Sequence, residues 1–337
     1  MKGIVRLAML LFCRHIRINR PEALRSRGPL LLACNHPNSF LDAVILDALF
    51  ERPIYSLARG DVFRHPWLNR LLGKLKILPV YRTSEGVENL GENYRTFDTC
   101  LELFRRGNIV LIFSEGKCVN EWHLRPLRKG TARLAVRSWE ENIPLEVLPV
   151  ALTYSSFRRF GKNLLLDFGD PIRQVDLEGL ATEGQRLVRF NQLLQGQLSR
   201  LVPEISRSDL DRQRVLLERP VTPTARWLLA MPAALGWLLH APLYLPAKNW
   251  ALRRGGHTDH YDSLLMALLL FTYPVYAGLL TALLWWQTRS PWSLLALLAL
   301  PATAWAFTRL KGQLDHPPAR AAGATGKGRF SPGGGPR

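Results

Sequence analysis

The sequence predicts an α/β fold in which a mostly parallel central sheet is covered by helices and followed by a carboxyl-terminal transmembrane helical hairpin. Between residues 29 and 169, short apolar runs alternate with amphipathic helical patterns, which is typical of parallel strands joined by helices. After residue 224 the composition changes to long apolar stretches with almost no charge. With 337 residues, the chain is long enough for one sizeable α/β core and further segments.

The strand candidates are short, continuously apolar runs, as expected of strands that are buried on both faces. They cover residues 30–34, 54–58, 77–80, 109–113, 146–152 and 164–168. Because helical patterns separate most of them, we expect a largely parallel sheet whose strands end at one common edge.

Two helical patterns stand out. Over residues 85–106, apolar side chains recur every three or four positions, and Gly107 ends the pattern. Residues 183–202 repeat the same spacing. We therefore predict a globular domain over residues 21–203, followed by a charged linker over residues 204–224.

Residues 1–20 are predicted to form an amphipathic, membrane-associating helix. Over residues 2–18, basic side chains fall within one arc of a helix and apolar side chains populate the other side. An apolar face with a basic rim suits the surface of an anionic bilayer. The alternative is an ordinary helix docked on the globular domain, because the segment is too short to span a membrane.

Three apolar segments make up the predicted membrane region, residues 225–310. Segments 264–286 and 292–307 are predicted to span, with tryptophans near their ends as in an interfacial belt. Segment 227–246 is interrupted by three prolines, so we predict that it is re-entrant or lies in the interface; the alternative is a third span. The re-entrant arrangement places the basic clusters at residues 248–254 and 309–311 on the cytoplasmic side, as the positive-inside rule favours. Residues 312–337 are predicted to be a disordered basic tail.

Charge and cysteine content limit the function classes. The formal net charge of +18 favours anionic partners such as phosphorylated substrates or a lipid bilayer. We expect no nucleic acid partner, because the sequence has no basic aromatic groove or recognition motif. The four cysteines form no CxxC pair, and the histidines have no ligand-like spacing, so we expect reduced thiols, no metal and no cofactor.

The candidate chemistry centres on residues 35–43, with the sequence NHPNSFLDA. His36 would lie just beyond the carboxyl end of the strand at 30–34, where open α/β sheets place their reactive groups. Ser39 or Asn38 would cap the next helix. Asp42, in the first turn of that helix, would accept a hydrogen bond from the imidazole. A histidine oriented by a carboxylate can act as a general base on a hydroxyl group.

Three further stretches complete a pattern: ILPVYR at 77–82, FSEGK at 113–117 and VLPV at 147–150. NHPNSFLD, PVYR, FSEG with the later RKGTARLA, and VLPV resemble the four sequence blocks of the glycerol-phosphate acyltransferase family. This family includes glycerol-3-phosphate and 1-acylglycerol-3-phosphate acyltransferases. The resemblance covers roughly residues 28–170, and the order of four blocks makes it far more specific than any single block.

The resemblance implies a membrane-bound O-acyltransferase of phospholipid synthesis. His36 would be the catalytic base and Asp42 its partner; Arg82 would bind the acceptor phosphate, and the strand of Pro149 would help to form the acyl-donor side. The predicted substrate-binding residues are Asn35, Asn38, Ser39, Arg82, Glu115, Gly116, Lys117, Arg128, Lys129 and Pro149. Acyl-CoA or acyl-carrier protein would be the co-substrate, and a phosphorylated glycerol or lysolipid the acceptor.

The spacing between His36 and Asp42 departs from the usual pattern. Five residues separate them here, whereas the family usually has four. On a continuous helix the two side chains would then point about 120° apart, so the extra residue must be absorbed before the helix begins, plausibly at Pro37 and Asn38. The longer spacing resembles a subgroup that acts on glycerol 3-phosphate or dihydroxyacetone phosphate.

Several alternatives stay open at this point. The chain could be another lysophospholipid acyltransferase, a lipid hydrolase that uses the same histidine, or a non-catalytic membrane adaptor; the absence of a GxSxG motif disfavours a serine esterase. Arg128 and Lys129 could instead attract an anionic membrane surface. Asp61 and His65 could form a second carboxylate–histidine pair, although a loop before a helix cap is the preferred interpretation. We expect the cell membrane, or the endoplasmic reticulum in a eukaryote, with the catalytic domain on the cytoplasmic face.

Overall fold

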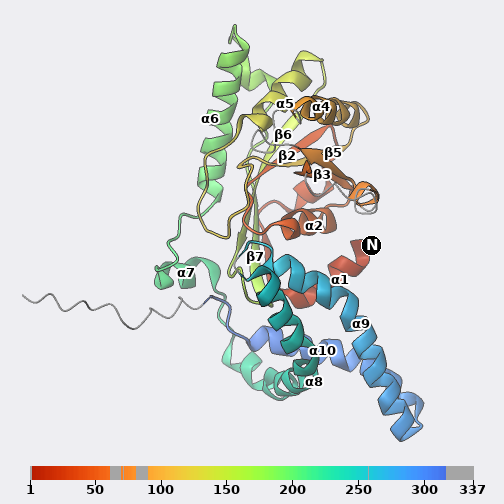
Figure 1. Ribbon diagram of the computed structural model, residues 1–337. Coiled ribbons are helices and arrows are strands. Elements are labelled where there is room, and N and C mark those ends of the chain that lie inside the picture. The colour runs from red at the N-terminus through yellow and green to blue at the C-terminus, as the bar shows by residue number, and fades with distance from the viewer. Residues whose placement is uncertain (1, 61–69, 71, 81–89, 257, 316–337) are drawn as a thin grey trace, which may run out of the picture.

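The computed structural model describes residues 2–60, 70, 72–80, 90–256 and 258–315. Within these residues, seven strands form one sheet in the order β1-β7-β6-β2-β5-β3-β4 (Figure 1). The strands are β1 (Cys13–Ile18), β2 (Leu30–Cys34), β3 (Ile54–Arg59), β4 (Ile77–Val80), β5 (Ile109–Phe113), β6 (Glu146–Tyr154) and β7 (Lys162–Phe168). Neighbouring strands are parallel except for the antiparallel pair β6 and β7. The prediction of a mostly parallel sheet is confirmed.

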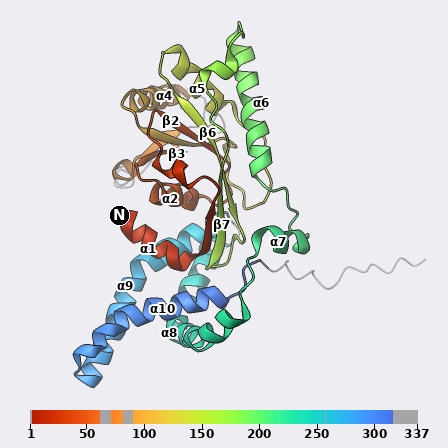
Figure 2. The ribbon, with the colours of Figure 1, turned by 180° about the vertical axis from the view of Figure 1, so that it is seen from behind.

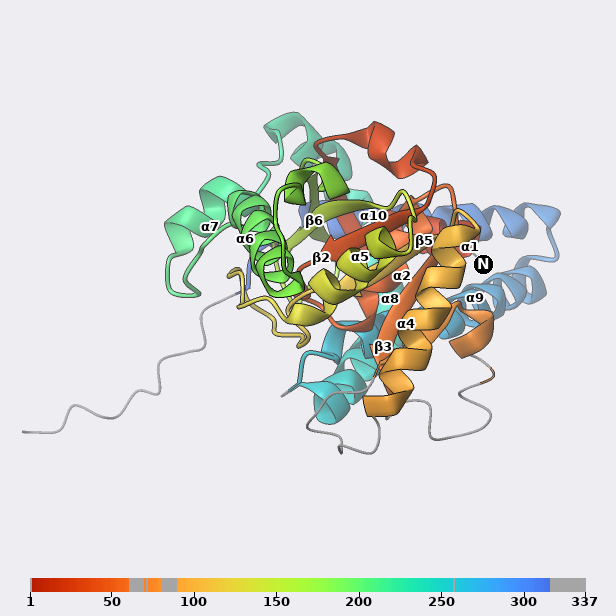
Figure 3. The same cartoon turned by 90° about the horizontal axis from the view of Figure 1, so that it is seen from above.

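The sheet lies between two layers of helices, each with its own apolar core. One core contains α2 (Phe40–Leu49) and α1 (Lys2–Phe12). The other contains α4 (Leu90–Arg105), α5 (Lys129–Glu140) and α6 (Glu183–Leu201), which Figure 3 shows across the near face of the sheet. Strand β2 pairs with β5 on one side and β6 on the other, and it is buried along its whole length because its alternate side chains belong to the two cores. The continuous apolar run at 30–34 therefore reflects cover on both faces.

The predicted helix over residues 2–18 is wrong in its second half. The helix ends at Phe12, and residues 13–18 form strand β1, which pairs in parallel with β7 at the edge of the sheet. In CRHIRI the side chains alternate and two positions are β-branched isoleucines, both of which favour an extended strand. Arg14, assigned to the basic rim of the predicted helix, is buried and donates to the carbonyl oxygen of Thr308 at 3.0 Å.

Helix α1 has a docked side and an exposed side. Lys2 donates to the carbonyl oxygens of Phe50 and Arg52, 3.1 and 2.9 Å away, and Arg6 donates to that of Ala48. These basic side chains therefore satisfy carbonyl groups at the carboxyl end of α2, where positive charge is favourable. On the opposite side Ile4, Leu7 and Leu10 are 62, 67 and 58% exposed. The helix is docked on the domain, as in the alternative interpretation, and it still presents an apolar stripe outwards.

The predicted linker over residues 204–224 is part of the folded domain. Residues Leu210–Leu217 form α7, in which Gln213 and Leu217 are buried. The amide of Gln213 donates to the carbonyl oxygens of Ser206 and Arg207, and Asn163 donates to that of Leu217 at 2.8 Å. The charged composition suggested a linker because half of the side chains of α7 are polar or charged. Only Gln213 and Leu217 are buried against the domain.

Three long apolar helices follow, and each is long and apolar enough to cross a membrane. They are α8 (Pro223–Gly255), α9 (Tyr261–Thr288) and the continuous segment Pro291–Leu310, which consists of the short helix η6 (Pro291–Leu295) and α10 (Ala296–Leu310). Figure 2 shows α9 and α10 side by side, with their connection far from the sheet, and α1 lies between α2 and this pair. Of the predicted tail, residues 312–315 pack on the domain, and the rest lies outside the described residues.

The segments that flank α8 are both bonded to the hairpin that β6 and β7 form. Before the helix, the carbonyl oxygen of Leu217 accepts from Asn163; after it, that of Gly256 accepts from Arg158 at 2.8 Å. A straight helix of 33 residues would be about 50 Å long, and it would hold these two flanking segments far apart. The helix therefore bends, and it contains Pro232, Pro242 and Pro246, which break the intrahelical hydrogen bonds. Figure 1 shows α8 leaving the domain and curving back to it.

Candidate active site

The reactive group follows directly after the central strand β2. At the end of this strand the side-chain amide of Asn35 donates to the carbonyl oxygen of Leu152 at 3.0 Å and accepts from its backbone amide at 2.8 Å. Asn35 thus extends the pairing of β2 with β6 by one residue and delivers His36 to the edge where the parallel strands end. Both polar groups of this buried amide are used, so the geometry favours a positioning role for Asn35 over the predicted contact with substrate.

His36 and Asp42 come together as the sequence predicted. The Nδ1 atom of His36 lies 2.9 Å from Oδ2 of Asp42. Since a buried carboxylate accepts and does not donate, Nδ1 carries the proton and Nε2 carries the lone pair. Within the described part of the chain Nε2 has no hydrogen-bond partner, and the side chain is 17% exposed. The ring stacks on Phe113 at 3.7 Å between centroids, which fixes its plane. This geometry would allow His36 to accept a proton at Nε2.

Asp42 is completely buried and is held by further donors. The backbone amide of Asn38 donates to Oδ2 at 2.8 Å, and the phenol of Tyr154 donates to Oδ1 at 2.8 Å. Burial, and next the charge of Asp42, raises the pKa of Tyr154 well above its usual range, so the phenol keeps its proton and remains a donor. Tyr154 was not predicted as a site residue; its only signal in the sequence is a tyrosine at the end of an apolar strand.

The extra residue between His36 and Asp42 is absorbed before the helix, as predicted. Helix α2 begins at Phe40, and Ser39, in the N-cap position, has a positive φ of 50°. The predicted side-chain cap is wrong for both candidates: no capping hydrogen bond forms. The hydroxyl of Ser39 instead lies 2.5 Å from Nδ1 of His260, and its backbone amide donates to the sulfur of Cys118 at 2.9 Å. The side chain and backbone amide of Ser39 are thus bonded to residues outside α2.

Glu115 is buried and bonded to the backbone on both sides. Its Oε2 accepts from the amide of His36 at 2.9 Å, and its Oε1 accepts from the amide of Arg125 at 2.9 Å. Burial raises the pKa of the Glu115 carboxyl, and the two amide hydrogen bonds act in the opposite direction. The FSEG stretch therefore holds the histidine loop against the loop that precedes α5.

A group of basic side chains surrounds the start of α5. Lys117, Arg128 and Lys129 are exposed, and none forms an ion pair with a carboxylate of the described residues. Gly116 has a φ of 65°, and a Cβ there would lie 3.0 Å from Cγ of Arg128, so glycine permits the close approach of this side chain. The amino end of a helix adds positive potential. Together they form an uncompensated positive surface that suits a phosphate group.

Two further predicted site residues, Pro149 and Asn38, are buried. Pro149 is buried in the sheet opposite Ala33, three residues before His36, so it lies along the strand from the reactive group. Asn38 is fully buried, and its side-chain amide donates to Asp262. Arg82, Asp61 and His65 lie outside the described residues. No group of three potential metal ligands occurs among the residues that the structure describes.

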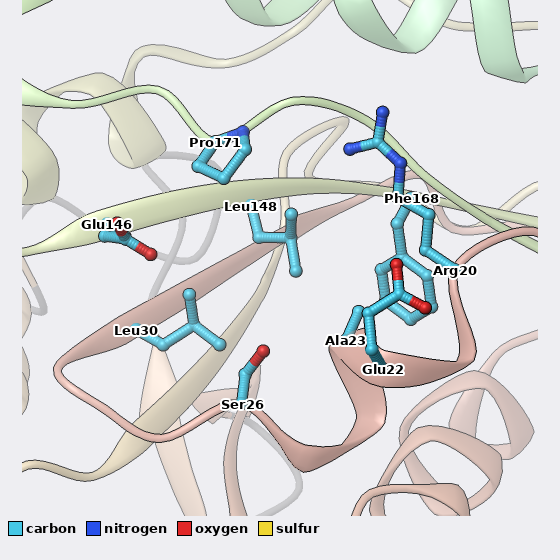
Figure 4. A pocket seen from close by; sticks show the side chains of 9 residues that line it. All are labelled: Arg20, Glu22, Ala23, Ser26, Leu30, Glu146, Leu148, Phe168 and Pro171. Atoms are coloured by element: carbon cyan, nitrogen blue, oxygen red, sulfur yellow. The ribbon is translucent and has the colours of Figure 1, made fainter.

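A cavity of about 170 Å³ lies at the end of the sheet opposite to His36, where strands β2 and β6 begin (Figure 4). Its lining includes Arg20, Leu30 and Glu146. Leu30 is the first residue of β2 and precedes His36 by six positions, which corresponds to roughly 20 Å along an extended chain. The cavity is therefore separate from the His36 site, and we assign no chemistry to it.

Comparison with known proteins identifies the region of the chain in which this site lies. The family model described as "Acyltransferase" matches residues 15–153. The chain is 22% identical over 187 residues to the 1-acyl-sn-glycerol-3-phosphate acyltransferase of Bacillus subtilis, which covers 55% of this chain and 87% of that protein. Residues 15–153 therefore form an acyltransferase domain. A structural likeness to the 1-acyl-sn-glycerophosphate acyltransferase PlsC of Thermotoga maritima has a TM-score of 0.42 at 15% identity, covering 60% of this chain and 78% of that one.

The acyltransferase domain includes His36, Asp42, Glu115 and the basic group at the start of α5. It ends one residue before Tyr154, the phenol donor to Asp42. Helices α8, α9 and α10 follow the matched region, and His260 and Asp262, at the start of α9, contact the loop between His36 and Asp42. The protein is an acyltransferase whose motif loop is supported partly by residues outside the family match.

Proposed function

We propose that this acyltransferase transfers a fatty acyl group from a thioester donor to a hydroxyl of glycerol 3-phosphate or 1-acylglycerol 3-phosphate in phospholipid synthesis. The observation that carries the proposal is the His36–Asp42 pair, in which Nδ1 is bound to a buried carboxylate and Nε2 is open. The name of the Bacillus relative supports a phosphorylated glycerol acceptor, and acyl-CoA or acyl-carrier protein is the proposed donor.

The proposed reaction is a direct transfer. Nε2 of His36 accepts the proton of the acceptor hydroxyl while its oxygen attacks the thioester carbonyl carbon. The tetrahedral intermediate then collapses, the carbon–sulfur bond breaks, and the imidazolium returns its proton to the departing thiolate. Asp42 stabilises the imidazolium between the two proton transfers and keeps the ring in the required tautomer. No covalent acyl-enzyme is needed.

Phosphate recognition is assigned to the basic group at the start of α5. Lys117, Arg128 and Lys129 have no carboxylate partner among the described residues, and they flank the loop that is bonded to the His36 amide. Arg82, from the PVYR stretch, is proposed as an additional bidentate phosphate ligand. The phosphate would hold the acceptor so that its free hydroxyl reaches Nε2.

We propose that the enzyme is anchored in a membrane with the catalytic domain on the cytoplasmic face. The residues that flank α8, Leu217 before it and Gly256 after it, are both bonded to the same hairpin of the domain, which supports a re-entrant segment. In this arrangement the basic clusters at residues 248–254 and 309–311 lie on the same side as the domain, as the positive-inside rule favours. Helices α9 and α10 would form the spanning hairpin.

The test compares purified, detergent-solubilised wild type with His36→Gln and Asp42→Asn. Acyl transfer is measured from acyl-CoA and from acyl-carrier protein to glycerol 3-phosphate, 1-acylglycerol 3-phosphate and a lysophospholipid. We expect activity on one phosphorylated acceptor and a loss of about 10²–10⁴-fold in kcat for His36→Gln. His123→Gln is the matched control, because this exposed histidine pairs with Glu204 on the surface.

Full activity in His36→Gln would overturn the assignment of the base. Release of free fatty acid that does not depend on an acceptor would replace the proposal with a lipid hydrolase. An enzyme that acylates only lysophospholipids without a terminal phosphate would contradict the proposed acceptor class while leaving the base intact.

A further inference from the structure

The catalytic loop is supported by the turn that joins α8 to α9. Three of the five residues between His36 and Asp42 are linked to it. The carbonyl oxygen of Pro37 accepts from Asn120, whose backbone amide donates to Asp259; Asn38 donates to Asp262; and Ser39 contacts His260. The last two residues of the turn, Asp259 and His260, and Asp262 in the first turn of α9 are thus linked to the loop that absorbs the extra residue.

The link between Asn38 and Asp262 is buried. The Nδ2 atom of Asn38 donates to Oδ2 of Asp262 at 2.9 Å, and the same oxygen forms an ion pair with Lys162 at the start of β7. Asn38 and Lys162 are 0% exposed, and Asp262 is 1% exposed. Because an unpaired charge in such a site is costly, Lys162 fixes the position of the carboxylate. The carboxylate in turn fixes the side chain of Asn38.

Asn38 transmits this position to the reactive pair. Its backbone amide donates to Oδ2 of Asp42 at 2.8 Å, the same oxygen that contacts Nδ1 of His36. A continuous set of contacts therefore runs from Lys162 and Asp262 through Asn38 to Asp42. The spacer of five residues has no side-chain cap of its own at the start of α2, so an external support has a physical purpose here.

We propose that Asp262, held by Lys162, is a positioning residue for the catalytic base: it acts through Asn38 and makes the acyl-transfer step depend on the docking of α9. The proposal rests on the proposed role of His36 as the base. It assigns a kinetic role to a residue that lies outside the matched acyltransferase domain and in the first turn of a helix that could cross a membrane.

The decisive variant is Asn38→Ala, which removes the hydrogen bond to Asp262 but keeps both the ion pair with Lys162 and the backbone amide that binds Asp42. We expect kcat to fall about ten- to a hundredfold while KM for donor and acceptor stays within about twofold, because a small displacement of the base affects the chemical step. The paired variant Lys162→Met with Asp262→Leu removes the acceptor together with its counter-charge and should give a similar loss.

Combining Asn38→Ala with the paired variant tests whether both act through one contact. If they do, the combination is no worse than the more severe of the two, since the same hydrogen bond is already absent. Multiplication of the two losses would overturn the proposal, and so would an unchanged kcat in Asn38→Ala. If the paired variant does not fold, Asn38→Ala decides alone.

Asp315→Asn is the matched control. Asp315 also joins the segment after α10 to the domain, through Ser156 at 2.6 Å and the amide of Phe157 at 2.9 Å, but it does not touch the catalytic loop. We expect kcat within about twofold of wild type, whatever its melting temperature; an equal loss of kcat here would reduce Asp262 to a general structural role. Failure of the proposed function would appear separately, as wild-type activity that survives His36→Gln.

Discussion

The acyltransferase domain and the three carboxyl-terminal helices differ in how they treat apolar side chains. In the domain, large apolar residues from both helical layers are buried against the sheet. In the helical region, many point outwards, among them Trp227, Leu228, Met231, Phe271, Trp292 and Leu298, each more than 70% exposed. Soluble surfaces rarely carry apolar patches of this extent. The distribution of apolar side chains suits water around the acyltransferase domain. Hydrocarbon is the proposed environment of the three carboxyl-terminal helices.

The polar contacts between the two regions lie at their boundary. Asp259 and His260 come from the turn between α8 and α9, and Asp262 comes from the first turn of α9. Each reaches a residue of the catalytic loop or its neighbour Asn120. Helix α1 lies at the same boundary and presents Ile4, Leu7 and Leu10 outwards. The proposed membrane surface therefore passes close to the active site, which would allow a lipid substrate to reach His36 without leaving the bilayer entirely.

The largest expected effect comes from adding a charge to the helical region. Phe271 is 75% exposed near the middle of α9, so in Phe271→Arg the guanidinium would lie in hydrocarbon. We expect the free energy of membrane insertion to become less favourable by about 2.5–3.5 kcal/mol, measured as the apparent insertion free energy of the segment in a translocon assay.

The same change in the domain provides the contrast. Val188, on α6, is 56% exposed, and Val188→Arg should alter the stability and membrane retention of the protein by less than about 0.5 kcal/mol, because water solvates the new charge. Equal tolerance of arginine at both positions would remove the distinction between the two surfaces.

The second expected effect concerns packing between α8 and α10. A Cβ at Gly236 would lie 2.1 Å from the carbonyl oxygen of Thr303, so Gly236→Ala forces the two helix backbones apart. We expect a loss of about 1–3 kcal/mol in the free energy of unfolding, measured by denaturant titration in detergent. Gly278→Ala in α9 is the control, since nothing lies within 4 Å of a Cβ there. If Gly236→Ala and Gly278→Ala change the free energy of unfolding equally, the close contact of α8 with α10 does not contribute to stability.

The sequence predicted the parallel strands well, because burial on both faces leaves a continuous apolar run that needs no tertiary information. The helix predicted over residues 13–18 was wrong. Arg14 is buried there because its guanidinium donates to backbone carbonyl groups almost 300 positions away in the chain. A local pattern carries no information about such a partner. The same limit applies to α7, whose buried side chains become recognisable only once Asn163 is in place.

In the site, the His36–Asp42 pair followed from a short motif, and the position of the extra residue followed from helix geometry. Tyr154, His260 and Asp262 could not be found in this way. Each reaches the motif loop from a separate element more than a hundred positions away, and each is a residue type that is common without any function.

The smallest expected effect compares one chemical change in the two regions. Tyr154→Phe removes the phenol that donates to the buried Oδ1 of Asp42, leaving a charged acceptor without this partner. We expect a loss of about 1–2 kcal/mol in transition-state stabilisation, or roughly tenfold in kcat. Tyr276→Phe removes a phenol that donates to the carbonyl oxygen of Leu239 in the helical region, so it should affect stability and leave kcat unchanged. A normal kcat in Tyr154→Phe would mean that Asn38 and the imidazole alone are sufficient to orient Asp42, and the boundary contacts through Asn38 would then carry the whole positioning effect.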